Sequence, residues 1–173
     1  MRLLKAAGVA LGLAVAASSV MSAQEWDKKT IEKMLKDGAK KLASANQAER
    51  EDGIGYILGY ITCDYKAQYQ PVVVNALKDP SPKVRSAALQ TLEKVAAKDA
   101  IPQMALLLED PDKDVQDRAA FALGTIGDPS AEPYLKKARD NFRAQKKTSS
   151  ADMMQEGLDE ISGKSKTEHT HCP

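Results

Sequence analysis

The last residues of the chain carry the side chains best suited to metal binding. His169, His171 and Cys172 stand within four residues of one another, and they include both histidines and one of the two cysteines of the protein. Imidazole nitrogen and thiolate sulfur are ligands for zinc and copper ions. Three ligands fill only part of a coordination sphere, so a stable site needs a fourth ligand from elsewhere in the chain. The alternative is a frayed C-terminal tail that holds no metal.

The two cysteines, Cys63 and Cys172, could instead form a disulfide bond, provided that the protein reaches an oxidising compartment. The segment after Ser162 could extend about 33 to 36 Å, which is enough to reach back along a short helical array. The alternative is a buried free thiol at Cys63 and a reactive thiol at Cys172.

Motifs that would indicate catalysis are missing. The sequence contains no G-x-S-x-G elbow, no glycine-rich phosphate loop and no H-E-x-x-H helix, and no histidine precedes His169. We therefore expect neither an enzyme nor a bound cofactor.

The first 23 residues have the pattern of a secretory signal. Arg2 and Lys5 precede an apolar run from Ala6 to Ala17, and small residues follow up to Ala23. The run is shorter than the roughly 20 residues that span a bilayer, although a retained anchor is the alternative. We expect cleavage near Ala23, a secreted or periplasmic protein, and no membrane insertion after cleavage. Loss of two positive charges takes the formal net charge from +1 to −1, which argues against nucleic acid as a partner.

The elements that must position any site are set by an internal repeat. The segments "DPSPKVRSAALQTL", from Asp79, and "DPDKDVQDRAAFAL", from Asp110, stand 31 residues apart. Apolar residues recur within each segment at spacings of 4, 4 and 3, which places them on one helix face. The two sets are Val84, Ala88, Leu92 and Val95, and Val115, Ala119, Leu123 and Ile126.

Each unit is predicted to contain two helices. Ser81 and Asp112 suit the N-cap of the first helix, where a side-chain oxygen accepts from a free backbone N–H. Pro71, Pro102 and Pro133 align at the same 31-residue shift and are expected early in the second helix, where a missing N–H costs little. Stacked helix pairs bury a continuous core that a single pair cannot form.

The phrase D-P-x-x-x-V-x-x-x-A-x-x-x-L, followed by "IGDPSAEPYL", resembles the short HEAT-like repeat of phycobilisome lyases and related proteins. The resemblance implies an all-α fold, a right-handed α-solenoid of HEAT-like helix pairs with a capping helix at each end. HEAT-like arrays mostly bind other macromolecules, so it implies a binding or scaffolding module with a protein or peptide partner. We expect the chain to be a monomer.

The repeat also suggests the boundaries of the chain's parts. We predict a signal peptide over 1–23, an N-terminal capping helix within 24–47, the repeat array over 48–140, a C-terminal capping helix within 141–162 and a flexible tail over 163–173.

The second helix of each pair lines the concave side of HEAT-like arrays, so the resemblance implies a binding face there. The outward positions, equivalent by the 31-residue shift, are Val72, Gln103, Tyr134, Asn75, Leu106 and Lys137. Their mixture of apolar, amide, aromatic and cationic groups suits an interface. Alternatively, Val72 and Leu106 pack against neighbouring helices. A different function, metal handling or redox assistance by His169, His171 and Cys172, remains the second hypothesis.

Two further patterns have structural interpretations. Gly53, Gly55 and Gly59 favour a small-residue face for close helix contact, or a local adjustment of helix packing. Charged residues of the second repeat are predicted to form a solvated helix face; they are Asp112, Lys113, Asp114, Asp117 and Arg118.

Overall fold

The structure is a computed structural model and describes residues 27–164. These residues form α-helices joined by turns, some of them short 3-10 helices, and they contain no strand. The elements in chain order are α1 (Lys28–Leu42), α2 (Gln47–Tyr60), η1 (Cys63–Tyr65), α3 (Lys66–Ala76), α4 (Pro82–Lys94), η2 (Lys98–Ala100), α5 (Ile101–Ala105), η3 (Leu106–Glu109), α6 (Lys113–Ile126), η4 (Pro129–Ala131), α7 (Glu132–Ala144) and α8 (Thr148–Ile161).

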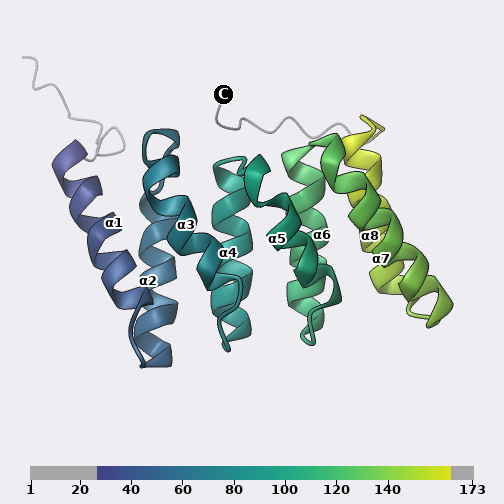
Figure 1. The fold of residues 1–173 in the computed structure, drawn as a ribbon, viewed down its shortest axis with the longest axis horizontal. Coiled ribbons are helices and arrows are strands. Elements are labelled where there is room, and N and C mark those ends of the chain that lie inside the picture. The colour runs from purple at the N-terminus through teal and green to yellow at the C-terminus, as the bar shows by residue number, and fades with distance from the viewer. Residues whose placement is uncertain (1–26, 165–173) are drawn as a thin grey trace, which may run out of the picture.

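The helices are arranged in two layers (Figure 1). In the first layer, α2, α4, α6 and α8 pack side by side along the array. In the second layer, α1, α3, α5 and α7 share a different inclination, and they cover one side of the first layer. α1 packs mainly against α2, and α8 packs against both α6 and α7. The predicted all-α solenoid of helix pairs is therefore confirmed. Within the described residues, no helix combines the length and the hydropathy that a membrane crossing requires.

The core lies between the layers and is built from the predicted helix faces. Each of the eight apolar residues identified in α4, α6 and their ends is buried: Val84, Ala88, Leu92 and Val95 in one unit, and Val115, Ala119, Leu123 and Ile126 in the next. Second-layer helices contribute Val73, Met104 and Leu135 to the same core. Equivalent residues thus perform equivalent packing, which explains why the sequence repeats.

The helix caps follow the prediction in position and differ in chemistry. Asp112 caps α6 as expected, because its carboxylate accepts from the N–H groups of Asp114 and Val115. Ser81 stands at the N-cap of α4 but makes no side-chain cap bond. Its hydroxyl instead donates to Glu51 of the preceding first-layer helix at 2.9 Å, so it joins two units. Gly127 ends α6 in the left-handed region with φ +68°, a conformation that glycine adopts without strain.

The prediction that the aligned prolines open the second helices holds for two of them. Pro102 and Pro133 lie in the first turns of α5 and α7, whereas Pro71 lies inside α3. The reason is an additional turn: α3 begins at Lys66, four residues earlier than the 31-residue register places it. The extra turn makes a contact of its own, because the Lys66 ammonium donates to the carbonyl of Ala96 in the next unit at 2.8 Å.

Glycines allow the two end helices to approach the array closely. A Cβ on Gly53 of α2 would lie 2.5 Å from the backbone nitrogen of Leu42 and 2.7 Å from the carbonyl oxygen of Gly38, both in α1. At the other end, a Cβ on Gly124 of α6 would lie 2.6 Å from the Cα of Gly157 in α8. The close-contact hypothesis is therefore correct for Gly53.

Candidate binding surfaces

The predicted binding residues lie on the second layer, and we call them the second-layer face. Val72 and Asn75 belong to α3, Gln103 to α5, Leu106 to η3, and Tyr134 and Lys137 to α7. Asn75 and Lys137 are exposed, whereas Val72 is half-buried and packs against the core. Whether these residues bind a partner stays a prediction, and their exposure shows which of them a partner could reach.

Two residues of the second-layer face are large, apolar and exposed. Leu106 has 70% of its surface exposed and Tyr134 has 39%. The two come from neighbouring elements, because η3 contacts α7. Because most of its surface is exposed, Leu106 does not pack against neighbouring helices, and the alternative interpretation is wrong for this residue. Tyrosine is enriched among the anchors of protein interfaces, and an exposed leucine on the same face adds apolar surface that a partner could bury.

Gln103 adds an unusual polar group to the same face. Its carbonyl oxygen Oε1 is buried, and no donor among residues 27–164 forms a hydrogen bond to it. A buried acceptor without a partner costs about 1–3 kcal/mol. Because this oxygen is shielded from solvent, a bound chain reaches it only if the Gln103 side chain moves.

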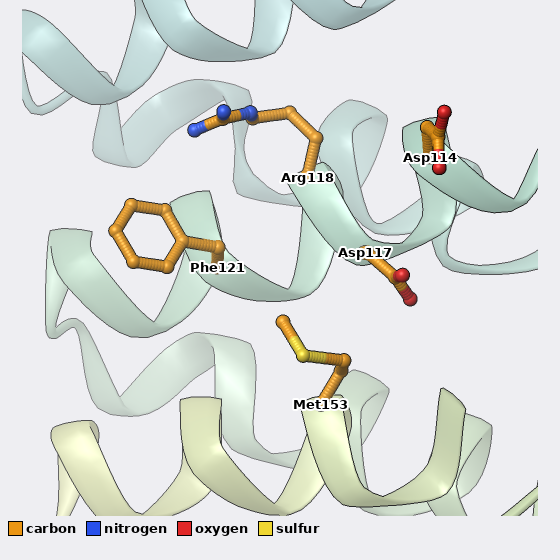
Figure 2. Close-up of a pocket in the computed structure, with 5 residues that line it drawn as sticks. All are labelled: Asp114, Asp117, Arg118, Phe121 and Met153. Atoms are coloured by element: carbon orange, nitrogen blue, oxygen red, sulfur yellow. The ribbon is translucent and has the colours of Figure 1, made fainter. Parts of the chain in front are cut away.

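A groove on the opposite side of the array lies between α6 and α8 (Figure 2). It has a volume of about 300 Å³ and is lined by Asp114, Asp117, Arg118, Phe121 and Met153. Phe121 has 39% of its surface exposed, and the Met153 side chain extends from α8 toward it. The groove therefore combines an apolar centre with charged groups at its margin.

The charged residues of the groove interact with its aromatic ring and with charged side chains nearby. The guanidinium carbon of Arg118 lies 5.5 Å from the centroid of the Phe121 ring, within the range of a cation–π contact. Asp117 pairs with Lys113 through Oδ2, and its Oδ1 is buried without a hydrogen-bond partner in the described chain. The predicted solvated face is thus only partly solvent-facing, because Asp112, Asp117 and Arg118 are half-buried, whereas Lys113 and Asp114 are exposed.

Phe121 was not among the residues identified from the sequence. Its equivalent one repeat earlier is Gln90, which is exposed. An aromatic residue at an outward position of a first-layer helix was the available signal, whereas the binding face was predicted only from outward positions of the second helices.

Several predicted site residues lie outside the described residues. The metal ligands His169, His171 and Cys172 are among them, so the metal hypothesis stays a prediction. Cys63, at the start of η1, is exposed, so the alternative of a buried free thiol at this position is wrong. It is not a free cysteine in the structure. The Cys63–Cys172 pairing stays a prediction because Cys172 is not described.

Comparison with known proteins agrees with the helix-pair architecture. A family model described as HEAT repeats matches residues 70–151, which run from α3 into the start of α8. No curated protein matches the chain with significant sequence similarity. The match covers the helix pairs whose 31-residue register and buried faces are described above. The helix pairs within residues 70–151 are therefore HEAT-like repeats.

Proposed function

We propose that this chain is a secreted or periplasmic binding module that holds a protein or peptide partner on its second-layer face. HEAT repeats generally mediate protein–protein interaction, which supports the class of function. A solenoid presents the outward positions of successive second-layer helices as one extended surface. The proposal that the chain is exported rests on the sequence pattern of residues 1–23.

The observation that carries the proposal is the exposure of Leu106. A leucine that is 70% exposed gains nothing from the core, and the partly exposed Tyr134 lies on the same face, in an element that contacts that of Leu106. A partner that buries both side chains would gain apolar contact at the centre of the face. Asn75 and Lys137 would then supply the polar margin of the interface.

To test the proposal, a photo-crosslinking amino acid is introduced at one position of the full chain at a time, and the protein is expressed in its native host cells. Crosslinks to one protein are expected from positions 106 and 134, whereas position 83 on first-layer helix α4 serves as the control. The crosslinked partner is then purified and its affinity is measured directly. Leu106→Ser with Tyr134→Ala should weaken binding by at least about tenfold.

The same variants must keep their melting temperature, because both side chains are exposed. Crosslinking from position 83 alone would contradict the proposal. So would unchanged affinity in the double variant. Crosslinking from position 121, with loss of affinity in Phe121→Ser only, would move the partner site to the groove between α6 and α8.

A further inference from the structure

The outer side of α1 carries a stripe of like charge. The buried residues Leu35, Gly38 and Leu42 face α2 and the core. On the opposite side, four exposed lysines follow one another at spacings of 4, 3 and 4, which keeps them on one helix face. They are Lys29, Lys33, Lys36 and Lys40, and none of them forms an ion pair with a described residue. We call this set the lysine stripe.

The outer side of α8 carries the opposite charge. Gly157 packs against α6, and Gln155 accepts a hydrogen bond from Arg139 of α7 at 3.0 Å, so these contacts define the inner sides of the helix. Asp152, Glu156 and Asp159 follow at spacings of 4 and 3. Asp152 and Glu156 are exposed, whereas Asp159 is half-buried and accepts a hydrogen bond from Gln155 at 3.1 Å. Asp159 lies 3.7 Å from the largely exposed Lys164, and Asp152 and Glu156 have no ion pair among the described residues. We call these three residues the acidic stripe.

The two stripes lie at opposite ends of the array (Figure 1). α1 is the outermost helix at the N-terminal end, and α8 closes the C-terminal end beside α7. At 1.5 Å per residue, the lysine stripe is about 16 Å long and the acidic stripe about 10 Å, so the carboxylates fit within the row of lysines. One chain cannot bring its own stripes together, whereas two copies can.

The order of the layers supports the same arrangement. The described array begins with a second-layer helix, α1, and ends with a first-layer helix, α8. A second copy placed against α8 would therefore present its α1, a second-layer helix, next in the alternation of the two layers. The layers would continue across the junction.

Segregation of charge is unfavourable for each helix by itself. Lysines at i and i+4, such as Lys29 with Lys33 or Lys36 with Lys40, repel one another, as do Asp152 and Glu156. Glu32 and Asp37, each four residues from a lysine of the stripe, offset only part of this repulsion in α1. A polar end cap needs no such segregation, because a mixture of signs covers a helix equally well. If the two stripes faced each other, attraction between the lysines and the carboxylates would offset the repulsion within each helix.

We propose that copies of this protein associate end to end, with the lysine stripe of one copy against the acidic stripe of the next. The interface is heterologous, so it produces an open row of copies rather than a closed dimer. Exposed ion pairs are individually weak, so the association occurs at high protein concentration, and the monomer expected from the sequence is the dilute state. The proposal does not depend on the proposed function, because the second-layer face remains open in the row.

The test uses charge reversal and sedimentation velocity on the full protein purified from its producing cells. One variant carries Lys33→Glu with Lys40→Glu, and another carries Asp152→Lys with Glu156→Lys. Each should weaken self-association by at least about tenfold. An equimolar mixture of the two should associate again, because each variant then offers the stripe that the other has lost. Lys78→Glu with Lys83→Glu makes the same change in net charge as the lysine-stripe variant, away from both stripes and from the second-layer face, and should leave self-association unchanged.

Association of the unchanged protein should also disappear at roughly 0.5 M salt, where exposed charges are screened. Circular dichroism of every variant checks that the helices are intact. A protein that stays monomeric at all concentrations in low salt would refute the proposal. So would two reversal variants that fail to associate when mixed, or a control variant that loses association as the stripe variants do.

Discussion

The guanidinium of Arg85 donates two hydrogen bonds to the carboxylate of Asp110, from Nε to Oδ2 at 2.8 Å and from Nη2 to Oδ1 at 2.7 Å. Arg85 belongs to α4 and Asp110 to the turn before α6, so the pair joins two units. Arg50 and Asp79 repeat this arrangement one unit earlier, at 2.7 and 3.2 Å. Each arginine also donates from Nη1 to two backbone carbonyls in the turn before its own helix. The pairs therefore fix the turns between successive units.

Asp79→Asn should destabilise the protein in a pH-dependent manner. Burial opposes ionisation of Asp79, but hydrogen bonds from Arg50 and from the N–H of Ser81 outweigh it and hold the pKa of Asp79 below its ordinary value. A lower pKa in the folded state means that the ionised carboxylate stabilises the fold above the unfolded pKa of about 3.9. The contribution disappears as the pH falls through the folded-state pKa. The variant should lose about 1–3 kcal/mol near pH 7.

Urea unfolding of both proteins between pH 2.5 and 7 (about the range over which a carboxylate titrates) measures this effect. The difference in the free energy of unfolding should be constant above about pH 5 and should shrink at lower pH. Asp99→Asn is the matched control, because Asp99 is exposed in η2 and makes no hydrogen bond within the described residues. A difference that stays the same down to the lowest pH would contradict an ionised Asp79 in the fold.

Gly53→Ala and Gly55→Ala should change stability in opposite directions. The added Cβ at position 53 would meet the backbone of α1 at 2.5 Å, and backbone atoms cannot move aside without separating the helices. We expect a loss of about 1–3 kcal/mol. At position 55 the added Cβ meets no atom within 4 Å, so the lower entropy of the unfolded chain should stabilise the variant by about 0.4–1 kcal/mol. Equal effects of the two substitutions in urea unfolding would refute this packing.

The sequence was sufficient to predict the first-layer faces but not the contacts between helices. Spacings of 4, 4 and 3 place Leu92 and Leu123 on a buried face whatever the neighbouring helix is. The three glycines of α2 look alike in sequence, yet Gly53 touches α1, whereas Gly55 and Gly59 meet no atom within 4 Å. Which glycine contacts α1 depends on where α1 crosses α2, and this crossing point is set by tertiary packing rather than by local sequence.

The candidate binding surfaces were predictable to a similar degree. The 31-residue register led to Leu106 and Tyr134 because outward positions repeat with the structure. Phe121 was missed because its exposure depends on how α8 packs beside α6, and the repeat does not determine the position of a capping helix. The bidentate pairs of Arg50 and Arg85 were missed for a related reason, since Asp79 and Asp110 serve the neighbouring unit rather than their own helix alone.

Leu92→Ala and Leu123→Ala should be equivalent truncations of the core. Leu92 has 1% of its surface exposed and Leu123 has none, at positions related by the repeat. Each substitution should lower the free energy of unfolding by about 2–5 kcal/mol, the range for a buried leucine that leaves a cavity. Leu106→Ala removes the same atoms from an exposed site and should change stability by less than about 0.5 kcal/mol. Thermal or urea unfolding compares the three. A small effect at Leu92 or Leu123 would exclude that residue from the core.

The cysteine prediction concerns Cys63 and Cys172, the only two cysteines of the chain. If the exported protein joins them, the bond closes a loop of more than 100 residues and restricts the unfolded chain. The chain-entropy model gives about 4.7 kcal/mol for a loop of roughly 100 residues, which strain in the folded state would reduce. Reduction should therefore lower the melting temperature of the unchanged protein, whereas Cys63→Ser should melt at the reduced value under both conditions.

Thiols are counted on protein from its native compartment, unfolded in acid to prevent exchange. Two reactive thiols per chain would exclude the bond, and none in a monomer would establish it.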